Sequence, residues 1–491
     1  MENQVPENVD DRIIINKYLS LWEALIPIIV LIAILSLNVY LYESDATSGP
    51  NQFALIIGGA VAAIVGFRNK ISYHKMIEEV SENIKSTAGA ILILLMVGAL
   101  SGTWLLSGII PTMIYYGLEI LHPSIFLPAC LIICSIISIA TGSSWTTSAT
   151  VGIALIGIGS TMGMPLGMVA GAVISGAYFG DKLSPLSDTT NLAPAMAGTD
   201  LFTHIRYMTL TTIPTMVITL ILFIILGLMQ DTTAITNDGS TLAAIKETFN
   251  VTPILFIVPL IVIVLIVKKT EPLIALLAGI LLGGIFALIF QPDLVAKMGG
   301  GEQLNFVNGY KGVMNSITTD TAIPTSNKVL SDLFTAKGMQ GMLGTVWLIL
   351  CAMVFGGIME AIGALARITD SLLKMFHTVF GLFASTVVSC LALNLTASDQ
   401  YLAIVVPGKM FAKAYKDKGL APENLSRTLE DSGTVTSVLI PWNTCGAYHS
   451  GVLGVSTFSY LPYAFFNIIS PFMTLIFAAF RIKIKQLSSS K

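Results

Sequence analysis

Charged residues are scarce in this chain. Asp, Glu, Lys and Arg make up only 11% of its 491 residues, whereas soluble domains average about 25%. Lys and Arg number 26 against 29 Asp and Glu, which gives a net charge of −3. The composition therefore excludes an ordinary soluble domain, and it offers no basic excess for binding nucleic acid.

Several catalytic and metal-binding motifs are also missing. The only Gly-Lys pair is Gly408-Lys409, which Met410 follows, so the chain has no GxxxxGK[ST] phosphate loop. HExxH and GxSxG are absent as well. The five cysteines form no CxxC pair and no Cys/His set typical of zinc. We therefore expect no cofactor, no ATP-driven pump and no enzyme of these hydrolase classes.

Long apolar runs are what the sequence does contain. Hydrophobic residues make up 54% of the chain, and the mean hydropathy is +0.80. A membrane-spanning helix needs about 20 apolar residues, and about eleven runs approach that length. They fall near 21–41, 52–67, 88–107, 123–140, 165–180, 205–229, 252–267, 272–290, 341–360, 379–395 and 458–480. The pattern predicts an all-α polytopic membrane protein.

Lysine and arginine in the loops predict how the chain is oriented. Arg12 and Lys17 precede the first apolar run, and basic residues recur at 68–87 and 481–485, whereas 42–51 contains none. Cytoplasmic loops of membrane proteins are enriched in Lys and Arg. We therefore expect a multi-pass protein of the cell membrane with both termini in the cytoplasm.

Two parts of the sequence resemble each other at an offset near 256 residues. SIATGSSW (138–145) aligns with LNLTASDQY (393–401), and LSPLSDTT (183–190) aligns with LIPWNTCG (439–446). The loop charges give the two parts opposite orientations. Inverted repeats with helices broken near the bilayer midplane are typical of secondary transporters, and the breaks mark the binding site.

The repeat suggests a division of the chain into five parts. Within each repeat, an apolar stretch interrupted by polar residues predicts a re-entrant hairpin (123–160 and 379–412) followed by an unwound helix, because lipid does not tolerate unpaired backbone groups. We expect a tail and extra first span at 1–51, the first repeat at 52–229, a connecting span at 230–271, the second repeat at 272–480 and a basic tail at 481–491.

Acidic residues inside the breaks are the strongest site candidates. A carboxylate at the bilayer centre costs about 2.5–3.5 kcal/mol on insertion scales, so it is a functional candidate by default. Asp188 and Asp399 lie within the breaks. Asp181, Glu360 and Asp431 are secondary candidates, because a position near the interface would explain them equally well. A carboxylate removed from water can hold either a proton or a cation near neutral pH.

Hydroxyl and amide oxygens accompany these acids. Sodium is held by oxygen ligands where membrane helices unwind, although a lone Ser or Thr often only bonds the carbonyl four residues back. We expect sodium at Asp188, Thr189, Ser143 and Asp399. The wider set of candidate ligands is Thr141, Ser144, Thr190, Asn191, Thr396, Ser398, Asn443 and Thr444.

The segment GDKLSPLSDTTNLAPAMAGTDLFTHIRYM (180–208), with TGSSWTTSATVGIA (141–154) before it, resembles the NhaC family of sodium/proton antiporters. The similarity covers residues 20–480. It implies paired inverted repeats and sodium/proton exchange, with Asp188 and its Thr-Thr-Asn neighbours at the site. Some similar proteins exchange a dicarboxylate and protons for sodium and a monocarboxylate, and this alternative stays open. Neither break contains an arginine to bind a carboxylate, which favours plain cation exchange.

The sequence thus predicts a secondary transporter that exchanges sodium for protons by alternating access. Its partners are sodium, protons and the lipid bilayer, and nothing in the sequence specifies or forbids a homo-oligomer. A membrane-embedded enzyme is the rival interpretation, supported by the intramembrane hydroxyls and acids. The missing nucleophile–base motif and the opposed repeats count against it.

Overall fold

The computed structural model describes residues 14–16, 18–42, 49–230, 240–268, 270–326, 328–375 and 378–487. Over these residues it is almost entirely helical, with one short antiparallel pair, β1 (Thr321–Ala322) and β2 (Thr335–Ala336). Arg12 and Lys17, which the orientation argument used, lie outside the described residues, as does 488–491 of the predicted basic tail. The predicted orientation in the membrane therefore stays a prediction.

Eight helices in the described residues are long and apolar enough to cross a membrane. They are α1 (Leu21–Tyr42), α2 (Pro50–Arg68), α3 (Tyr73–Leu106), α5 (Pro123–Thr141), α10 (Leu201–Leu228), α13 (Pro272–Phe290), α17 with α18 (Gly338–Ala361) and α20 (Val379–Thr396). Two bent helix pairs, Thr241–Thr248 with Pro253–Val267 and Thr457–Tyr463 with Phe465–Ala479, raise the number to ten. The predicted all-α polytopic fold is confirmed.

Two series of elements follow each other in the same order. The first is α5, α6 (Ser144–Thr147) continued by η2 (Ser148–Gly152) and α7 (Ile153–Thr161), α8 (Leu166–Leu183), α9 (Asp188–Ala197) and α10. The second is α20, α21 (Gln400–Asp417), α22 (Pro422–Leu429) continued by η4 (Glu430–Thr434) and η5 (Ser437–Leu439), α23 (Thr444–Leu453), and α24 (Thr457–Tyr460) with η6 (Leu461–Tyr463) and α25 (Phe465–Ala479).

The spacing between the two series is constant. The first begins its elements at residues 123, 144, 166, 188 and 201, and the second at 379, 400, 422, 444 and 457. Every pair is 256 residues apart, which matches the offset that the sequence suggested. Each series contains a helical hairpin and a helix that breaks and restarts.

Polar side chains begin the helices on the far side of each break. The first N–H groups of a helix have no partner within the helix, and a side-chain oxygen one residue earlier accepts from them. Ser143 accepts from the Thr146 amide at 3.1 Å, and Asp399 accepts from the Tyr401 amide at 2.8 Å. Ser187 and Asn443 start α9 and α23 in the same way. The polar residues that interrupt the apolar runs are thus needed to restart helices inside the protein.

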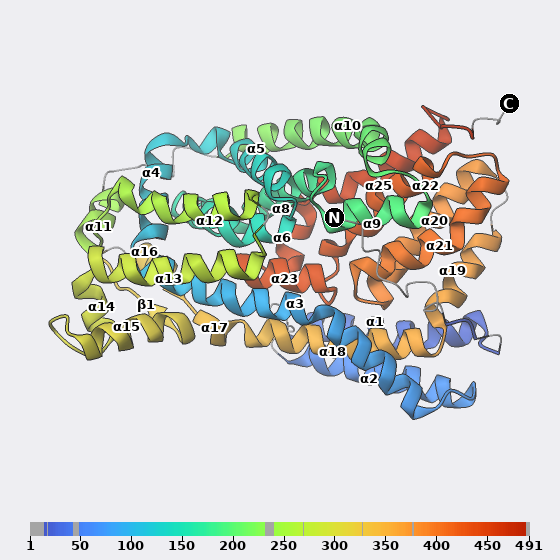
Figure 1. The fold of residues 1–491 in the computed structure, drawn as a ribbon, viewed down its shortest axis with the longest axis horizontal. Coiled ribbons are helices and arrows are strands. Elements are labelled where there is room, and N and C mark those ends of the chain that lie inside the picture. Colours follow the sequence, from blue (N-terminus) through green and yellow to red (C-terminus); the bar gives the residue numbers. More distant parts are fainter. Residues whose placement is uncertain are drawn as a thin grey trace.

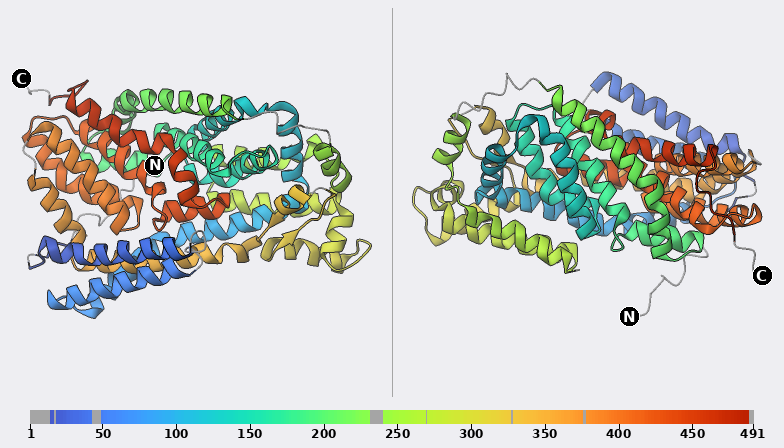
Figure 2. Two further views of the ribbon diagram at one scale, coloured as in Figure 1. Left: turned by 180° about the vertical axis from the view of Figure 1, so that it is seen from behind. Right: turned by 90° about the horizontal axis from the view of Figure 1, so that it is seen from above.

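The remaining helices surround these series. α18 (Leu343–Ala361) packs on α2 and α3, which lie along one side of the molecule with α1 (Figures 1 and 2). The other elements are α4 (Ile109–Ile120), α11 (Ser240–Thr248), η3 (Pro253–Phe256), α12 (Ile257–Val267), α14 (Pro292–Met298), α15 (Phe306–Thr318), α16 (Lys328–Leu333), α17 (Gly338–Gly341) and α19 (Ala364–Met375).

Glycines allow α8 to lie close to α5. A methyl group added at Gly176 would come within 2.3 Å of the Leu131 carbonyl oxygen, and one at Gly180 within 2.5 Å of the Ser135 carbonyl oxygen. Small residues at helix contacts let backbones approach in this way. The close contact fixes the end of α8, where the first break begins.

Candidate functional site

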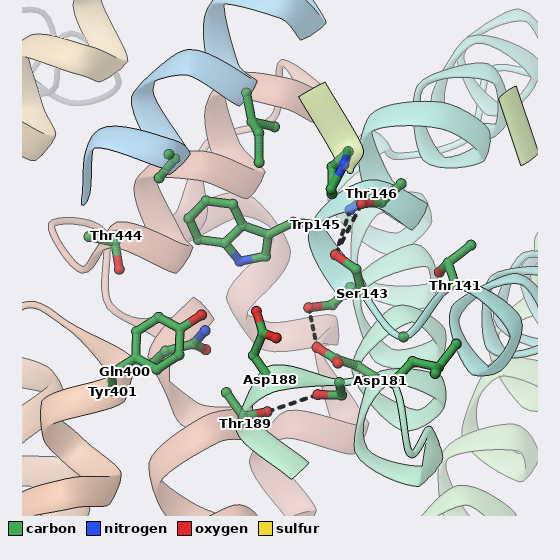
Figure 3. Close-up of a pocket in the computed structure, with 18 of the residues that line it drawn as sticks. Thr141, Ser143, Trp145, Thr146, Asp181, Asp188, Thr189, Gln400, Tyr401 and Thr444 are labelled. Carbon is green, nitrogen blue, oxygen red and sulfur yellow. Dashed lines mark hydrogen bonds between the residues drawn. The ribbon is translucent and has the colours of Figure 1, made fainter. Parts of the chain in front are cut away.

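The tips of both hairpins and the starts of both restarted helices meet at one cavity of about 640 Å³. It is lined by Thr141–Thr146 from the first tip, Asp399–Tyr401 from the second tip, Pro185–Thr189 from the first break and Thr444 at the start of α23. Part of α3 and the turn between α12 and α13 complete the wall. Figure 3 shows the side chains around this space.

Asp181 connects α8 to the first hairpin tip. The Ser144 hydroxyl donates to Asp181 Oδ2 at 2.7 Å, and both residues are buried. Ser143, next to it, accepts from the amide and the hydroxyl of Thr146, each at 3.1 Å. The tip thus presents several oxygen atoms beside one carboxylate, as a hard cation such as sodium requires.

Asp188, the first residue of α9, is exposed to the cavity. Its carboxylate lies between Asp181 and Tyr401 (Figure 3). The Tyr401 phenol and the Glu271 carboxylate are both close enough to interact with it. The hydroxyl groups of Thr189, the next residue, and Ser187 form a hydrogen bond of 3.2 Å. Asp188 is therefore the carboxylate of the first break most accessible to an entering ion.

Asp399 takes the corresponding place on the second tip. It is 7% exposed, and one of its oxygens accepts from the amides of Tyr401 and Leu402 at 2.8 and 3.1 Å. The backbone of Thr444 is tied to this tip, because its amide donates to the Ser398 carbonyl at 2.9 Å. The second hairpin and the second broken helix therefore reach the cavity as one unit.

The cavity wall is acidic. Four carboxylates line it, Asp181, Asp188, Glu271 and Asp399, and no Lys, Arg or His is among the described residues that line it. An uncompensated negative field attracts cations and repels anions. Within the described part of the chain, no group of three or more His, Cys, Asp and Glu is arranged to hold a metal ion. Hydroxyl and backbone oxygens would therefore have to join the carboxylates in holding a transported cation.

Sequence reasoning missed three features of this wall. Glu271, between α12 and α13, was not among the predicted site residues, but it lines the cavity. Gln400 and Tyr401 flank Asp399 and line the cavity too. The Trp145 ring stacks on Tyr448 at 4.0 Å between ring centroids. For Trp145, Gln400 and Tyr401 the sequence signal was their position at the breaks, whereas Glu271 lies beside no break.

Some candidate ligands support the breaks and do not line the cavity. Thr190 donates to the carbonyls of Asp181 and Lys182, each at 3.2 Å, which holds the end of α8 against α9. Thr396 bonds the carbonyl four residues back at 2.8 Å. Asn191 donates to the carbonyls of Pro185 and Ser187, and Asn443 donates to Asn394. The buried hydroxyl of Ser398 makes no hydrogen bond to any of the described residues.

Two of the secondary acidic candidates lie elsewhere. Asp431 is fully buried in η4 and forms an ion pair with Lys182. Glu360, at the end of α18, is buried beside Asn83 of α3, whose amide can donate to it at 3.2 Å. The structure thus brings Asp181, Asp188 and Asp399 together with Thr141, Ser143, Ser144, Thr189 and Thr444, and places Asp431 and Glu360 apart from them.

These features define a class of protein. Broken helices that meet at one cavity within a bundle of apolar helices, in two series with the same order of elements, are typical of secondary transporters. Residues 176–482 match the model of the Na⁺/H⁺ antiporter family, and the chain belongs to this family. It is a transporter and not an enzyme.

Relatives of known name agree with this assignment over most of the chain. The Na⁺/H⁺ antiporter NhaC of Alkalihalophilus pseudofirmus is 36% identical over 86% of this chain and 88% of its own. The NhaC of Bacillus subtilis is 38% identical over 82% of this chain and 86% of its own. The malate-2H⁺/Na⁺-lactate antiporter of Bacillus subtilis is 38% identical over 93% of this chain and 94% of its own.

Proposed function

We propose that this protein exchanges sodium for protons across the cell membrane by alternating access. The observation that carries the proposal is the acidic cavity, with four carboxylates and no basic side chain among its described lining residues. Such a wall stabilises a cation and disfavours an organic anion. The family and the two NhaC relatives, which are named as Na⁺/H⁺ antiporters, support the same exchange.

Both hairpin tips and the first break provide the sodium site in this proposal. Asp188 of the first break and Asp399 of the second tip supply charge, and Ser143 and Thr189 supply neutral oxygens. Asp181, held by Ser144, is a further carboxylate within the same space. Either sodium or protons can neutralise these carboxylates, so the two ions compete for the same empty site.

Alternating access then follows from the repeat. Corresponding elements of the two series begin 256 residues apart, and residues from both series line the cavity. If 52–229 and 272–480 are oppositely oriented repeats, rocking one against the other exposes the site to each side in turn. Cytoplasmic termini, with Arg481, Lys483 and Lys485 at the end of the chain, belong to the same proposal.

An organic-acid exchanger is the second candidate. The malate-2H⁺/Na⁺-lactate antiporter matches 93% of this chain, and a cavity of about 640 Å³ has room for more than a sodium ion. The hydroxyls of Ser143 and Thr146 could hold carboxylate oxygens. The absence of a basic side chain in the described lining leaves a bound dicarboxylate without a counter-charge, which ranks this function second.

Vesicles that contain the purified protein separate the two functions. With a pH gradient preset across the membrane, sodium alone should collapse the gradient if the protein is an antiporter for sodium and protons. An exchanger that requires an organic acid should respond only when malate or lactate is added on the appropriate side. The second result would replace the proposed function with the alternative, and no response to either addition would contradict both.

A further inference from the structure

A second group of buried charges lies next to the cavity. Lys182 follows Asp181 in the last turn of α8, and the two side chains point to different places. Asp181 lines the cavity, whereas Lys182 is fully buried and forms an ion pair with Asp431 of η4. Asp431 also accepts from the hydroxyls of Thr211 and Thr474. Each charge of this pair is therefore compensated.

Glu430, the residue before Asp431, has no such partner. It is fully buried, and neither of its carboxylate oxygens makes a hydrogen bond among the described residues. Lys182, Asp181 and Asp431 are near enough to interact with it electrostatically, and the hydroxyl of Thr434 lies close by. Because Lys182 is already paired with Asp431, an ionised Glu430 would add an uncompensated buried charge, which is costly. A bound proton removes that cost.

Other titratable groups around Glu430 do not supply the missing charge. Arg427, one turn earlier on α22, is fully buried, but its guanidinium lies over the rings of Tyr207 and Phe477, at 4.6 and 5.6 Å from their centroids. It forms no ion pair in the described part of the chain. Other titratable groups on the elements around η4 are neutral or face elsewhere. They are His204 of α10, which bonds Ser426 at 2.7 Å, Tyr415 of α21, whose hydroxyl bonds Thr386 at 3.2 Å, Cys390 of α20, which lies beside Ser432, and Asp188 of α9, which faces the cavity.

We propose that Glu430 is a proton-binding site separate from the sodium site and coupled to it through Asp181 and Lys182. The proposal rests on the proposed sodium/proton exchange. While the cavity is empty, the negative charge of Asp181 favours a proton on Glu430. Sodium bound beside Asp181 cancels that charge, the O–H bond of Glu430 breaks, and water takes up the proton. Sodium and this proton therefore oppose each other without sharing a ligand.

The coupling between sodium binding and protonation of Glu430 is reciprocal. If sodium weakens proton binding at Glu430, protonation of Glu430 weakens sodium binding by the same factor, and such couplings typically amount to about 5–150-fold. Part of the pH dependence of sodium binding then comes from outside the cavity. The number of protons released for each sodium ion bound includes a contribution from Glu430, in addition to those from the cavity carboxylates.

Calorimetry with the purified full chain tests whether Glu430 contributes to the protons released when sodium binds. Sodium is titrated into the protein in buffers of different ionisation enthalpy, which gives the protons released per sodium bound. We expect Glu430→Gln, which mimics the protonated residue, to release fewer protons than the wild type. Its sodium affinity should fall about fivefold or more at alkaline pH and match the wild type at acidic pH. Glu423→Gln is the control, because Glu423 is a buried carboxylate of α22 that pairs with Lys485, away from the cavity.

Equal proton release by Glu430→Gln and the wild type would overturn the inference and leave the proposed function standing. A wild type that binds no sodium would instead contradict the proposed function itself. If the glutamine variant fails to fold, Glu430→Asp keeps a titratable group. Infrared difference spectra should then show a protonated carboxyl band that sodium removes from the wild type and that is shifted in the aspartate variant. An unshifted band would overturn the inference.

Discussion

Ser144 donates a hydrogen bond of 2.7 Å to Asp181, and this contact joins the tip of the first hairpin to the end of α8. The two residues are 37 positions apart in the chain, and both are buried at the wall of the cavity. A hydrogen bond to a charged group stabilises that group by about 1.5–3 kcal/mol. The bond therefore holds the Asp181 carboxylate at the wall of the cavity, where a cation can reach it.

Removing this donor should weaken sodium binding. In Ser144→Ala, Asp181 loses a partner for its charged form, so protons compete better with sodium. We expect the apparent affinity for sodium at pH 7 to fall about tenfold, which corresponds to about 1.4 kcal/mol, as measured by sodium-dependent collapse of a pH gradient in vesicles. Ser86→Ala is the control, because the Ser86 hydroxyl also lies at the cavity but bonds the Asn83 carbonyl. A similar loss in both variants would contradict the role of Ser144.

Neutralising Asp188 should abolish exchange. Asp188→Asn keeps the size of the side chain and removes the charge, and folding should survive because a carboxylate in a membrane protein is costly to keep. The measurement is sodium/proton exchange in vesicles, with gel filtration to confirm folding. Asp200→Asn is a matched control, because Asp200 caps α10 by accepting from the Thr203 amide at 2.9 Å, and Asn caps helices equally well. Normal exchange by Asp188→Asn would remove Asp188 from the mechanism.

Glu271 should act through its charge on the cavity. It interacts with Asp188 but is not among the proposed sodium ligands. Glu271→Gln weakens the negative field that concentrates sodium, so we expect the sodium concentration for half-maximal exchange to rise severalfold while the maximal rate is kept. Glu247→Gln, at a residue that bonds Ser326 and does not line the cavity, should change neither quantity. Loss of the maximal rate in Glu271→Gln would instead make Glu271 a ligand or a proton carrier.

Competition between the ions sets the sign of the pH dependence. As pH falls, protons occupy the cavity carboxylates, so the sodium concentration for half-maximal exchange should rise in the wild type. Kinetics of exchange at several pH values measure this directly. A sodium requirement that is independent of pH would contradict both shared carboxylates and the coupling through Glu430.

Cysteine labelling can establish the orientation. The five native cysteines are all buried, so they should give little background. Phe306 of α15 is 89% exposed, and we expect Phe306→Cys to lie outside. Lys416 of α21 is also exposed, and we expect Lys416→Cys to lie inside. In right-side-out cells, an impermeant maleimide should modify only the first. Labelling of both from the same side would contradict the predicted orientation of the second repeat.

The packing of α8 on α5 makes a prediction about stability. In Gly180→Ala, the new methyl group would meet the Ser135 carbonyl and the Ser138 side chain, both at 2.5 Å. Overpacking of this kind costs about 1–3 kcal/mol, so the unfolding temperature in detergent should drop. In Gly344→Ala, in α18, the new methyl group would have no neighbour within 4 Å. This variant should therefore keep or raise the unfolding temperature. Equal unfolding temperatures would show that α8 can move away from α5 without cost.

The sequence by itself determined the class of fold and the positions of the breaks. Hydropathy is a local property, so the apolar runs at 123–140 and 379–395 predicted α5 and α20 within a few residues. Helix capping is local too, because a side chain bonds an amide two or three residues further on. The interruptions near Ser187 and Asn443 could therefore be interpreted as places where helices restart.

Only the tertiary structure decided which side chains meet. Glu271 was not among the predicted site residues, and it reaches the cavity because α13 packs on α3 and α12 packs on α13. Lys182 and Asp431 are 249 residues apart, and the ion pair depends on how α8 lies against η4. Asp181 and Lys182 are neighbours in the chain, yet one faces the cavity and the other the buried pair. Such contacts depend on the distances between helices, which the order of residues along one helix does not encode.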